Sequence, residues 1–351
     1  MFIPITMVRR GRERGDSSHV SPSVLFILKT KEAKVKRGFY LDKRMPDDKM
    51  NPPCTAKKNI PCPAVHVHSK ERLAEQMLVQ VEKLPPLPAV ATQIMRLIKD
   101  DKSDAKSFEG LLKQDPLLTA RLLRLVNSSF FGLPNKIASI PQAIVVIGFK
   151  SLKNLVIAAS VNRMMEGQFP GYGFTEGGLW RHSILNAQWS EKLAKELGWT
   201  ADSTEEIFVI GLLHDVGKLI LSSYINEHMQ DMISTLIECR GDIIEAENRL
   251  VGITHPEVGS YIAKEWKFPD QLSAIIRDHH KFVPEKYEKE SAVLQVVNYL
   301  INKNHIGMYD HFPLEKPLCE QCLEVLGLNQ TDLPEIQQGI LASSLSSDEQ
   351  L

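Results

Sequence analysis

Apolar residues recur with a helical period along most of the chain beyond about residue 70. Residues 71–82 and 89–99 each place their apolar side chains on one face, as amphipathic helices do. The pair Asp115-Pro116 predicts another helix start, because aspartate caps free amides and proline suits the first turn. No segment shows the sustained alternation of a half-buried strand. The pattern therefore predicts an all-α fold.

The helical pattern continues in the second half of the chain. Residues 180–197 stop at Gly198, a common helix terminator, and the apolar residues of 204–223 predict one continuous helix. The segment Thr254-His255-Pro256-Glu257 has the spacing of a capping box, which predicts a further helix start. Residues 171–178 contain several glycines and are expected to form a loop.

Charge separates the first 70 residues from the rest. Residues 1–70 carry 15 Lys or Arg against 6 Asp or Glu, whereas the remainder carries 27 against 37. With no sustained apolar period, they are expected to form a basic, disordered tail. The ordered part is expected to be a domain at 71–281, made of an N-terminal helical subdomain at 71–165 and a second subdomain at 175–281. Residues 282–351 then form a helical extension with a flexible end.

Composition limits the class of protein. The chain has five cysteines, which are too few and too scattered for a disulfide-stapled secreted scaffold. The pair Cys319 and Cys322 lacks a second pair at metal spacing, so a zinc or redox role is not expected. No apolar run approaches the length of a membrane span. We therefore expect a reduced, cytoplasmic protein that does not associate with membranes.

A histidine and a carboxylate stand side by side in the apolar run, as His214 and Asp215. An ionised carboxylate in apolar surroundings is costly unless it is paired or bound to a metal. A single histidine on an apolar face is more often structural than functional, but several of them flank this pair. The flanking histidines are His182, His255, His279 and His280. Five imidazoles and one carboxylate suit a divalent transition metal such as iron, manganese, zinc or nickel.

The two adjacent pairs, His214-Asp215 and His279-His280, are compatible with two metal ions. A carboxylate can bridge two cations about 3.5–4 Å apart, while imidazoles complete each ligand shell. Water on such metals is acidic enough to attack a phosphoester near neutral pH. Lys218 follows His214 by one helical turn and could hold a phosphate oxygen. If the site is active, Asp215 and Lys218 are therefore the expected catalytic residues.

The order of these residues resembles the HD superfamily of metal-dependent phosphohydrolases. Leu213–Lys218 is similar to the signature shared with the HD-GYP cyclic-diguanylate phosphodiesterases. A longer resemblance, over roughly 76–281, is to the HDOD domain of bacterial signalling proteins. It is carried by Leu84–Pro88, by Asp115–Ser128 and by Ile140–Gly148. The resemblance implies a multi-helical HDOD fold whose second subdomain is HD-like.

Two features depart from the enzymatic pattern. Asn298 stands where HD enzymes have a final aspartate ligand, and its neutral carbonyl binds cations more weakly. The Gly-Tyr-Pro segment that follows the paired histidines in HD-GYP enzymes is absent, since His280 leads into Lys281–Lys286. Many HDOD domains are thought to be non-catalytic. The resemblance therefore implies a regulatory module that binds metal and a nucleotide or a signalling protein; the alternative is an active phosphohydrolase on a nucleotide or cyclic dinucleotide.

Residues 117–165 contain six Lys or Arg and no acid, inside an otherwise acidic body. Solvated helix faces are the simplest explanation, and a surface for an anionic ligand is the alternative. Short helices at 116–127 and 141–147 resemble a helix-turn-helix in spacing only. The second is almost wholly apolar and could not read bases, so we do not expect nucleic-acid binding.

Overall fold

The computed structural model describes residues 65–98, 105–128, 133–310, 312–313 and 317–348. Within these ranges the chain forms helices and no strands, which confirms the predicted all-α class. Most of the basic segment predicted at 1–70 lies outside the described residues. The part that is described begins a helix at residue 65, six residues earlier than the apolar period indicated.

The helices fall into an N-terminal and a C-terminal series. The first series is α2 (Val65–Glu82), α3 (Ala89–Ile98), α4 (Ala105–Leu112), α5 (Pro116–Val126), α6 (Ile140–Ile147) and α7 (Phe149–Met165). The second is η2 (Pro170–Tyr172), α8 (Gly178–Glu196), α9 (Ala201–Leu213), α10 (Lys218–Glu227), α11 (Met229–Glu238), α12 (Ile243–Leu250), α13 (His255–Glu265), α14 (Asp270–Asp278), α15 (Glu288–Lys303), α16 (Glu320–Leu326) and α17 (Leu333–Asp348).

The predicted helix starts are present, and side-chain caps account for them. The Asp115 carboxylate accepts a hydrogen bond from the amide of Leu118 at 2.9 Å, and proline follows it at the first position of α5. Thr254 and Glu257 form the predicted capping box of α13. These caps satisfy free amides at two helix starts that lead into buried apolar faces.

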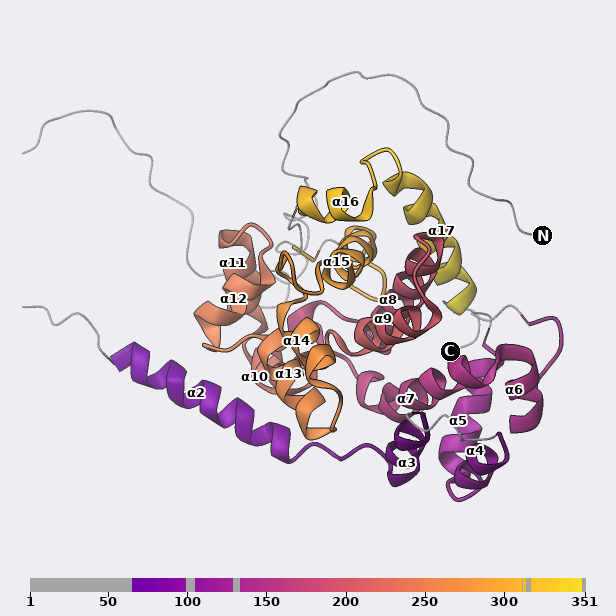
Figure 1. Ribbon diagram of the computed structural model, residues 1–351. Coiled ribbons are helices and arrows are strands. Elements are labelled where there is room, and N and C mark those ends of the chain that lie inside the picture. The colour runs from indigo at the N-terminus through magenta and orange to yellow at the C-terminus, as the bar shows by residue number, and fades with distance from the viewer. Residues whose placement is uncertain (1–64, 99–104, 129–132, 311, 314–316, 349–351) are drawn as a thin grey trace, which may run out of the picture. The chain divides into compact units, whose positions relative to one another are not determined.

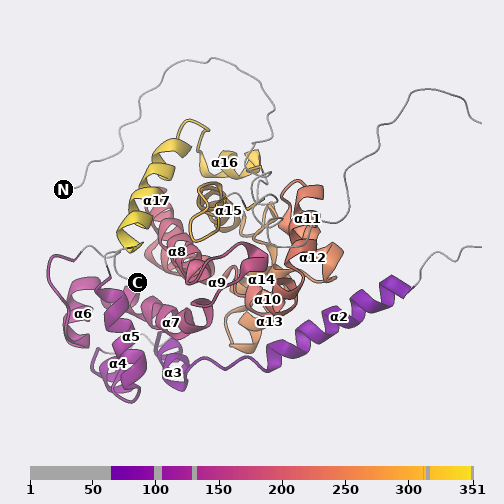
Figure 2. The ribbon, with the colours of Figure 1, turned by 180° about the vertical axis from the view of Figure 1, so that it is seen from behind.

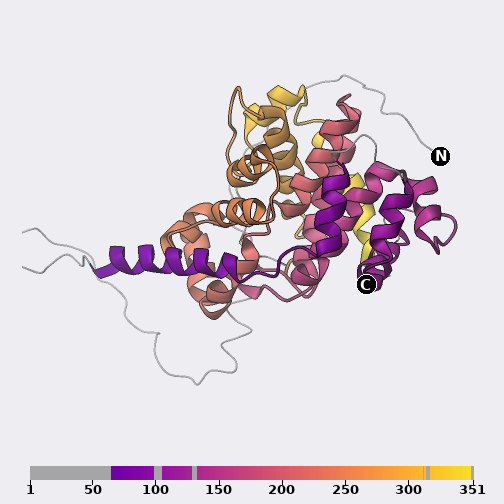
Figure 3. The same cartoon turned by 60° about the horizontal axis from the view of Figure 1, so that its bottom comes forward.

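Helices α3 to α7 gather in one group, which α7 joins to the remaining helices (Figure 1). Helix α8 packs against α9 and α15, and α16 and α17 cover α15 (Figure 2). Helix α2 packs against α13 and α10, away from α3 to α7 (Figure 3). Helices α8, α9, α13, α14 and α15 surround the histidine and aspartate side chains that the sequence predicts as metal ligands.

The helix predicted over 204–223 is two helices rather than one. Helix α9 ends at Leu213, the chain turns through residues 214–217, and α10 begins at Lys218. The turn is held by short-range hydrogen bonds, from the amide of Val216 to the carbonyl of Leu213 and from the amide of Lys218 to that of Asp215. Apolar periodicity does not reveal the break, because both helices bury their apolar residues in the same core.

Contrary to expectation, one apolar run of span length exists among the described residues. Ala201–Glu227 is long and apolar enough to cross a membrane by length and composition alone, with a mean hydropathy of 1.4 in its most apolar window. That window is 83% buried inside the fold. Packing against neighbouring helices thus accounts for its apolar character, and one such run is weak evidence of a membrane span.

Candidate metal centre

Six side chains predicted as metal ligands come together inside the C-terminal helices. His182 lies in the first turns of α8, His214 directly follows α9, and His255 is the first residue of α13. Asp215 lies in the turn after α9, and the pair His279-His280 follows the end of α14. The structure therefore places every predicted ligand at or near a helix end. Five are completely or almost completely buried, and His280 is half-buried.

Close helix packing brings the first three donors together. A Cβ atom added at Gly211 would lie 2.8 Å from the Cα of Ala187, so α9 crosses α8 at backbone contact. His182 Nε2 then lies 3.4 Å from His214 Nε2 and 3.3 Å from Asp215 Oδ2. His214 Nε2 is 3.4 Å from the same carboxylate oxygen. We call His182, His214 and Asp215 the first donor set.

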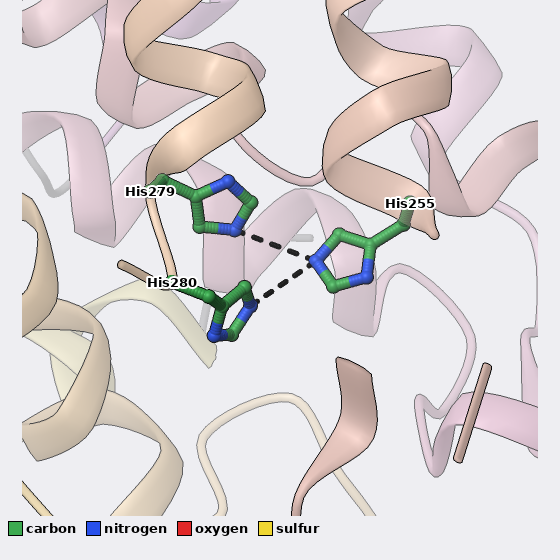
Figure 4. Close-up of side chains that lie close together, drawn as sticks. All are labelled: His255, His279 and His280. Atoms are coloured by element: carbon green, nitrogen blue, oxygen red, sulfur yellow. Dashed lines mark hydrogen bonds between the residues drawn. The ribbon is translucent and has the colours of Figure 1, made fainter. Parts of the chain in front are cut away.

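Three imidazoles form a second donor set, made of His255, His279 and His280. Figure 4 shows the rings of His279 and His280 directed at His255 from the same chain turn. His255 Nε2 is 3.4 Å from His279 Nε2 and 3.2 Å from His280 Nε2. In each donor set, one ligand atom per residue lies within 4.8 Å of the others.

Asp215 connects the two donor sets. Its Oδ2 atom faces the first set, whereas its Oδ1 atom lies 3.2 Å from His255 Nε2 and 3.9 Å from His279 Nε2. The ammonium of Lys218 also lies 2.7 Å from Oδ2 and is almost fully buried. Lys218, expected from the sequence to hold a phosphate oxygen, is thus an ion-pair partner of Asp215 in this structure.

The hydrogen bonds of two imidazoles leave nitrogen atoms that could face a cation. His214 and His279 each place Nδ1 2.7 Å from a backbone carbonyl, of Gly211 and Ile276 respectively. A ring that donates from Nδ1 has, when neutral, a lone pair on Nε2. Facing lone pairs repel one another, and Asp215 Oδ1 is buried with no hydrogen-bond donor among the described residues. A divalent ion bound between these atoms would accept the facing lone pairs and would give Asp215 Oδ1 a partner.

Glu247 and Tyr172 support the second donor set from behind His255, and neither residue was identified from the sequence. Glu247, completely buried, lies 2.8 Å from His255 Nδ1 and accepts the backbone amide of His255 at 2.8 Å. Tyr172 donates its hydroxyl proton to the same carboxylate at 2.6 Å. A carboxylate behind a ligand histidine fixes the ring and makes its free nitrogen a better donor. Neither residue stands in a motif, so only the fold reveals them.

Burial controls the charge of the centre. Desolvation lowers the pKa of His182 to about 4 and lowers the pKa values of His279 and His280 well below their ordinary value. Burial also opposes a charged His255, but the neighbouring Glu247 carboxylate raises the pKa of that imidazole. For Asp215, burial is outweighed by the side chains of His214 and Lys218, which hold the pKa of the carboxyl well below its usual range.

We expect acid to destabilise the metal-free protein between about pH 6.5 and pH 4. The pKa of His182 falls from 6.5 to about 4 on folding, so within this window the unfolded chain binds a proton that the folded protein does not. The free energy of unfolding therefore decreases as the pH falls, by about 3 kcal/mol from His182 alone. The lowered pKa values of His279 and His280 act in the same direction, and the raised one of His255 acts against them.

Thermal melts of chelator-treated protein at successive pH values measure this effect. The His182→Gln variant should lose part of the pH dependence, because it removes one of the suppressed protonations. A melting temperature that stays constant across the window would show that these imidazoles are not held neutral by the fold.

Asn298 lies on α15 and is almost fully buried, as a residue close to the centre should be. It lines the same pocket as His279 and His280. Its Oδ1 atom accepts a hydrogen bond from the amide of Asn302 at 3.2 Å. The pocket wall beside the second donor set is therefore neutral at this position.

One family model and one curated relative match the sequence of this chain. The family model of the HDOD domain matches residues 84–282. A protein of Treponema pallidum (strain Nichols) is 25% identical over 232 residues, which are 66% of this chain and 44% of that protein. The chain thus spans less than half the length of this curated relative.

Solved structures share the fold. An HDOD domain protein of unknown function from Geobacter sulfurreducens gives a TM-score of 0.66 at 24% identity, covering 81% of this chain and 99% of its own. A candidate phosphohydrolase from Shewanella amazonensis SB2B gives 0.60 at 26% identity, with 78% and 98% covered. A candidate signal transduction protein from Marinobacter aquaeolei VT8 gives 0.63 at 19% identity, with 80% and 65% covered.

The family match covers more than half of the chain and includes all six candidate ligands. The helical architecture agrees with that of the solved HDOD domain. This chain therefore belongs to the HDOD domain family.

Proposed function

We propose that this protein is a regulatory signalling module of the HDOD type that holds a divalent transition metal ion in its histidine centre. The observation that carries the proposal is the pair of donor sets that share Asp215. Five converging imidazoles with one carboxylate suit iron, manganese, zinc or nickel better than calcium or magnesium. A bound ion of this kind would supply a Lewis acid at the histidine centre.

The charges favour one firmly bound ion over two. Asp215 is the one carboxylate among the six candidate ligands, and two dications close together would repel each other strongly. Lys218 already places a positive charge 2.7 Å from Oδ2, on the side of the first donor set. We therefore propose that His255, His279, His280 and Oδ1 of Asp215 hold the firmer ion, and that a second ion at His182 and His214 is weak.

An active phosphohydrolase is the second candidate function. The shared Asp215 favours it, because a carboxylate between two ligand sets is what a two-metal hydrolase needs. In that role Asp215 would hold the ions and Lys218 would neutralise charge on a phosphoryl oxygen. Asn298 argues against efficient turnover, because it stands where HD enzymes have an aspartate ligand and its neutral amide adds no charge to hold an ion.

We expect the purified protein to hydrolyse cyclic and linear dinucleotides no faster than its Asp215→Ala variant, to within about twofold. The reason is that the attacking oxygen and the phosphate must be fixed between two rigidly held ions. The measurement is a phosphoester panel with added manganese or iron. Robust turnover that disappears in Asp215→Ala would make the protein an enzyme and overturn the regulatory assignment.

The Asn298→Asp variant belongs in the same panel. A gain of activity over an inactive parent would identify a phosphohydrolase site that is disabled at one ligand.

The remaining parts of the proposal are a cytoplasmic location and a signalling protein or a nucleotide as partner. They rest on the composition of the chain and on what the family resemblance implies.

A further inference from the structure

A pocket of about 560 Å³ lies beside the second donor set. Its volume is in the range of small-molecule sites, roughly 300–1,000 Å³. One wall is α15, another is the segment after α14, and a third is the chain before α16. The residues that line it are Gly241, Ile243, His279, His280, Phe282, Gln295, Asn298, Tyr299, Asn302, Lys303, His305, Pro317, Leu318 and Cys319. We call it the α15 pocket.

The charge of the α15 pocket favours an anion. Among its described lining residues there is one lysine, Lys303, and no carboxylate. Lys303 makes no ion pair with the described residues, and its ammonium lies 5.7 Å from the ring of Tyr299. An ammonium without a carboxylate partner at the wall of a concave site attracts a negatively charged ligand.

Asn298 offers a hydrogen-bond donor to the same ligand. The residue is 7% exposed, and its Oδ1 atom already accepts a hydrogen bond from the side-chain amide of Asn302. The Nδ2 group has no acceptor among the described residues, so its two protons are available to the pocket. An aspartate here would instead repel an anion. The amide thus serves a phosphate better than it serves a metal.

A second, larger cavity has the opposite charge pattern. That cavity, of about 990 Å³, is lined by Asp270, Glu285, Glu288 and Glu290 against two lysines, Lys286 and Lys289. Its excess of carboxylates disfavours anions. Lys303 in the α15 pocket and Lys289 in this acidic cavity can therefore be compared in one binding experiment.

We propose that the α15 pocket binds a phosphate monoester of a compound with a planar ring, such as a nucleoside monophosphate. Lys303 and Asn298 hold the phosphate, and Phe282 and Leu318 supply apolar surface for the ring. Lys303 offers one cationic contact at one place in the pocket, which suits a ligand with one phosphate group rather than the two separate phosphodiesters of a cyclic dinucleotide. The inference deepens the proposed regulatory function by naming its ligand class, although the binding groups do not require the metal.

Calorimetric titration of the full chain with AMP tests this inference, with adenosine and inorganic phosphate as partial probes. AMP should bind, adenosine should not bind measurably, and Lys303→Gln should weaken AMP binding at least tenfold. Asn298→Ala should weaken it by a smaller factor. Lys289→Gln, in the acidic cavity, should leave binding unchanged. Equal AMP affinity of the unmodified protein and Lys303→Gln, or no binding by either, would overturn the proposal.

Alkylation of cysteine gives an independent measurement. Cys319 lines the α15 pocket and is half-buried, whereas Cys322 is fully buried. AMP should slow the reaction of Cys319 with iodoacetamide, as read from peptide masses, and Lys303→Gln should remove this protection. Equal protection of Cys319 in the unmodified protein and in Lys303→Gln would show that Lys303 does not hold AMP in the α15 pocket.

The titration is run on metal-loaded and on chelator-treated protein. Binding of AMP by a protein that never holds metal would leave this inference intact while the metal-binding proposal fails. A metal-loaded protein that does not bind AMP would overturn this inference and leave the metal-binding proposal intact.

Discussion

Replacing His214 and Asp215 together with alanine should remove at least nine-tenths of the transition metal from the purified protein. Asp215 is shared by both donor sets, so its loss leaves the second set with three neutral imidazoles and no charge. The first set keeps a single ligand, His182. Elemental analysis of protein made in medium supplemented with iron, manganese, zinc and nickel measures the result, and it identifies the ion.

The control for this experiment is His228→Ala. His228 lies outside both donor sets, with Nδ1 3.0 Å from the carbonyl of Tyr224 and its ring stacked on that tyrosine. This variant should keep its metal. If the unmodified protein is itself free of metal, the histidine cluster is structural and the metal-binding proposal is wrong.

The double variant also removes the partner of a buried ammonium. Lys218 is 6% exposed and pairs with Asp215, so Asp215→Ala leaves a charge in apolar surroundings at a cost of several kcal/mol. Circular dichroism therefore accompanies the metal analysis. Asp215→Asn keeps the shape of the side chain and removes its charge, and it should lose metal to a similar extent. Loss of metal from this variant would show that the loss in the double variant is not caused by unfolding alone.

The second large effect is expected from Gly217→Ala, which should lower the free energy of unfolding by roughly 3 kcal/mol. The backbone of Gly217 has φ of −63°, an ordinary helical value, so conformational freedom is not the reason for glycine. A Cβ atom here would overlap the carbonyl oxygen of His255 and lie 2.7 Å from the amide nitrogen of Gly259. These are backbone atoms of α13, which cannot move aside as a side chain would.

Because the methyl group pushes directly against His255, Gly217→Ala should also lose metal. Thermal melts and elemental analysis measure both effects. Gly110→Ala is the matched control, since no atom lies within 4 Å of the added Cβ and the residue is inside α4. That change should be neutral or slightly stabilising. A Gly217→Ala protein as stable as the Gly110→Ala protein would show that α10 and α13 are not packed this closely.

Local sequence signals were sufficient to predict the all-α class and the positions of several helix starts. Aspartate before proline at Asp115 and the capping box at Thr254 act through contacts within three residues, so sequence alone reveals them. The identity of the six candidate ligands was equally visible, because histidines beside a carboxylate stand out in an apolar run.

The arrangement of the ligands was not predictable in the same way. On a continuous helix, His214 and Asp215 would point about 100° apart. The turn after Leu213 directs both into one centre, and that turn is fixed by the contact of Gly217 with α13. Glu247 supports His255 from another helix, eight residues earlier. Contacts between helices decide these positions, and apolar periodicity does not encode which helices cross.

Helix α13 carries the candidate ligand His255 at its first position and packs against α2 along its side. Helix α2 is the first helix that the structure describes. An α-helix of eleven residues is a stiff rod about 16 Å long. Helix α13 therefore connects the histidine centre to the α2 contact through one continuous rigid element.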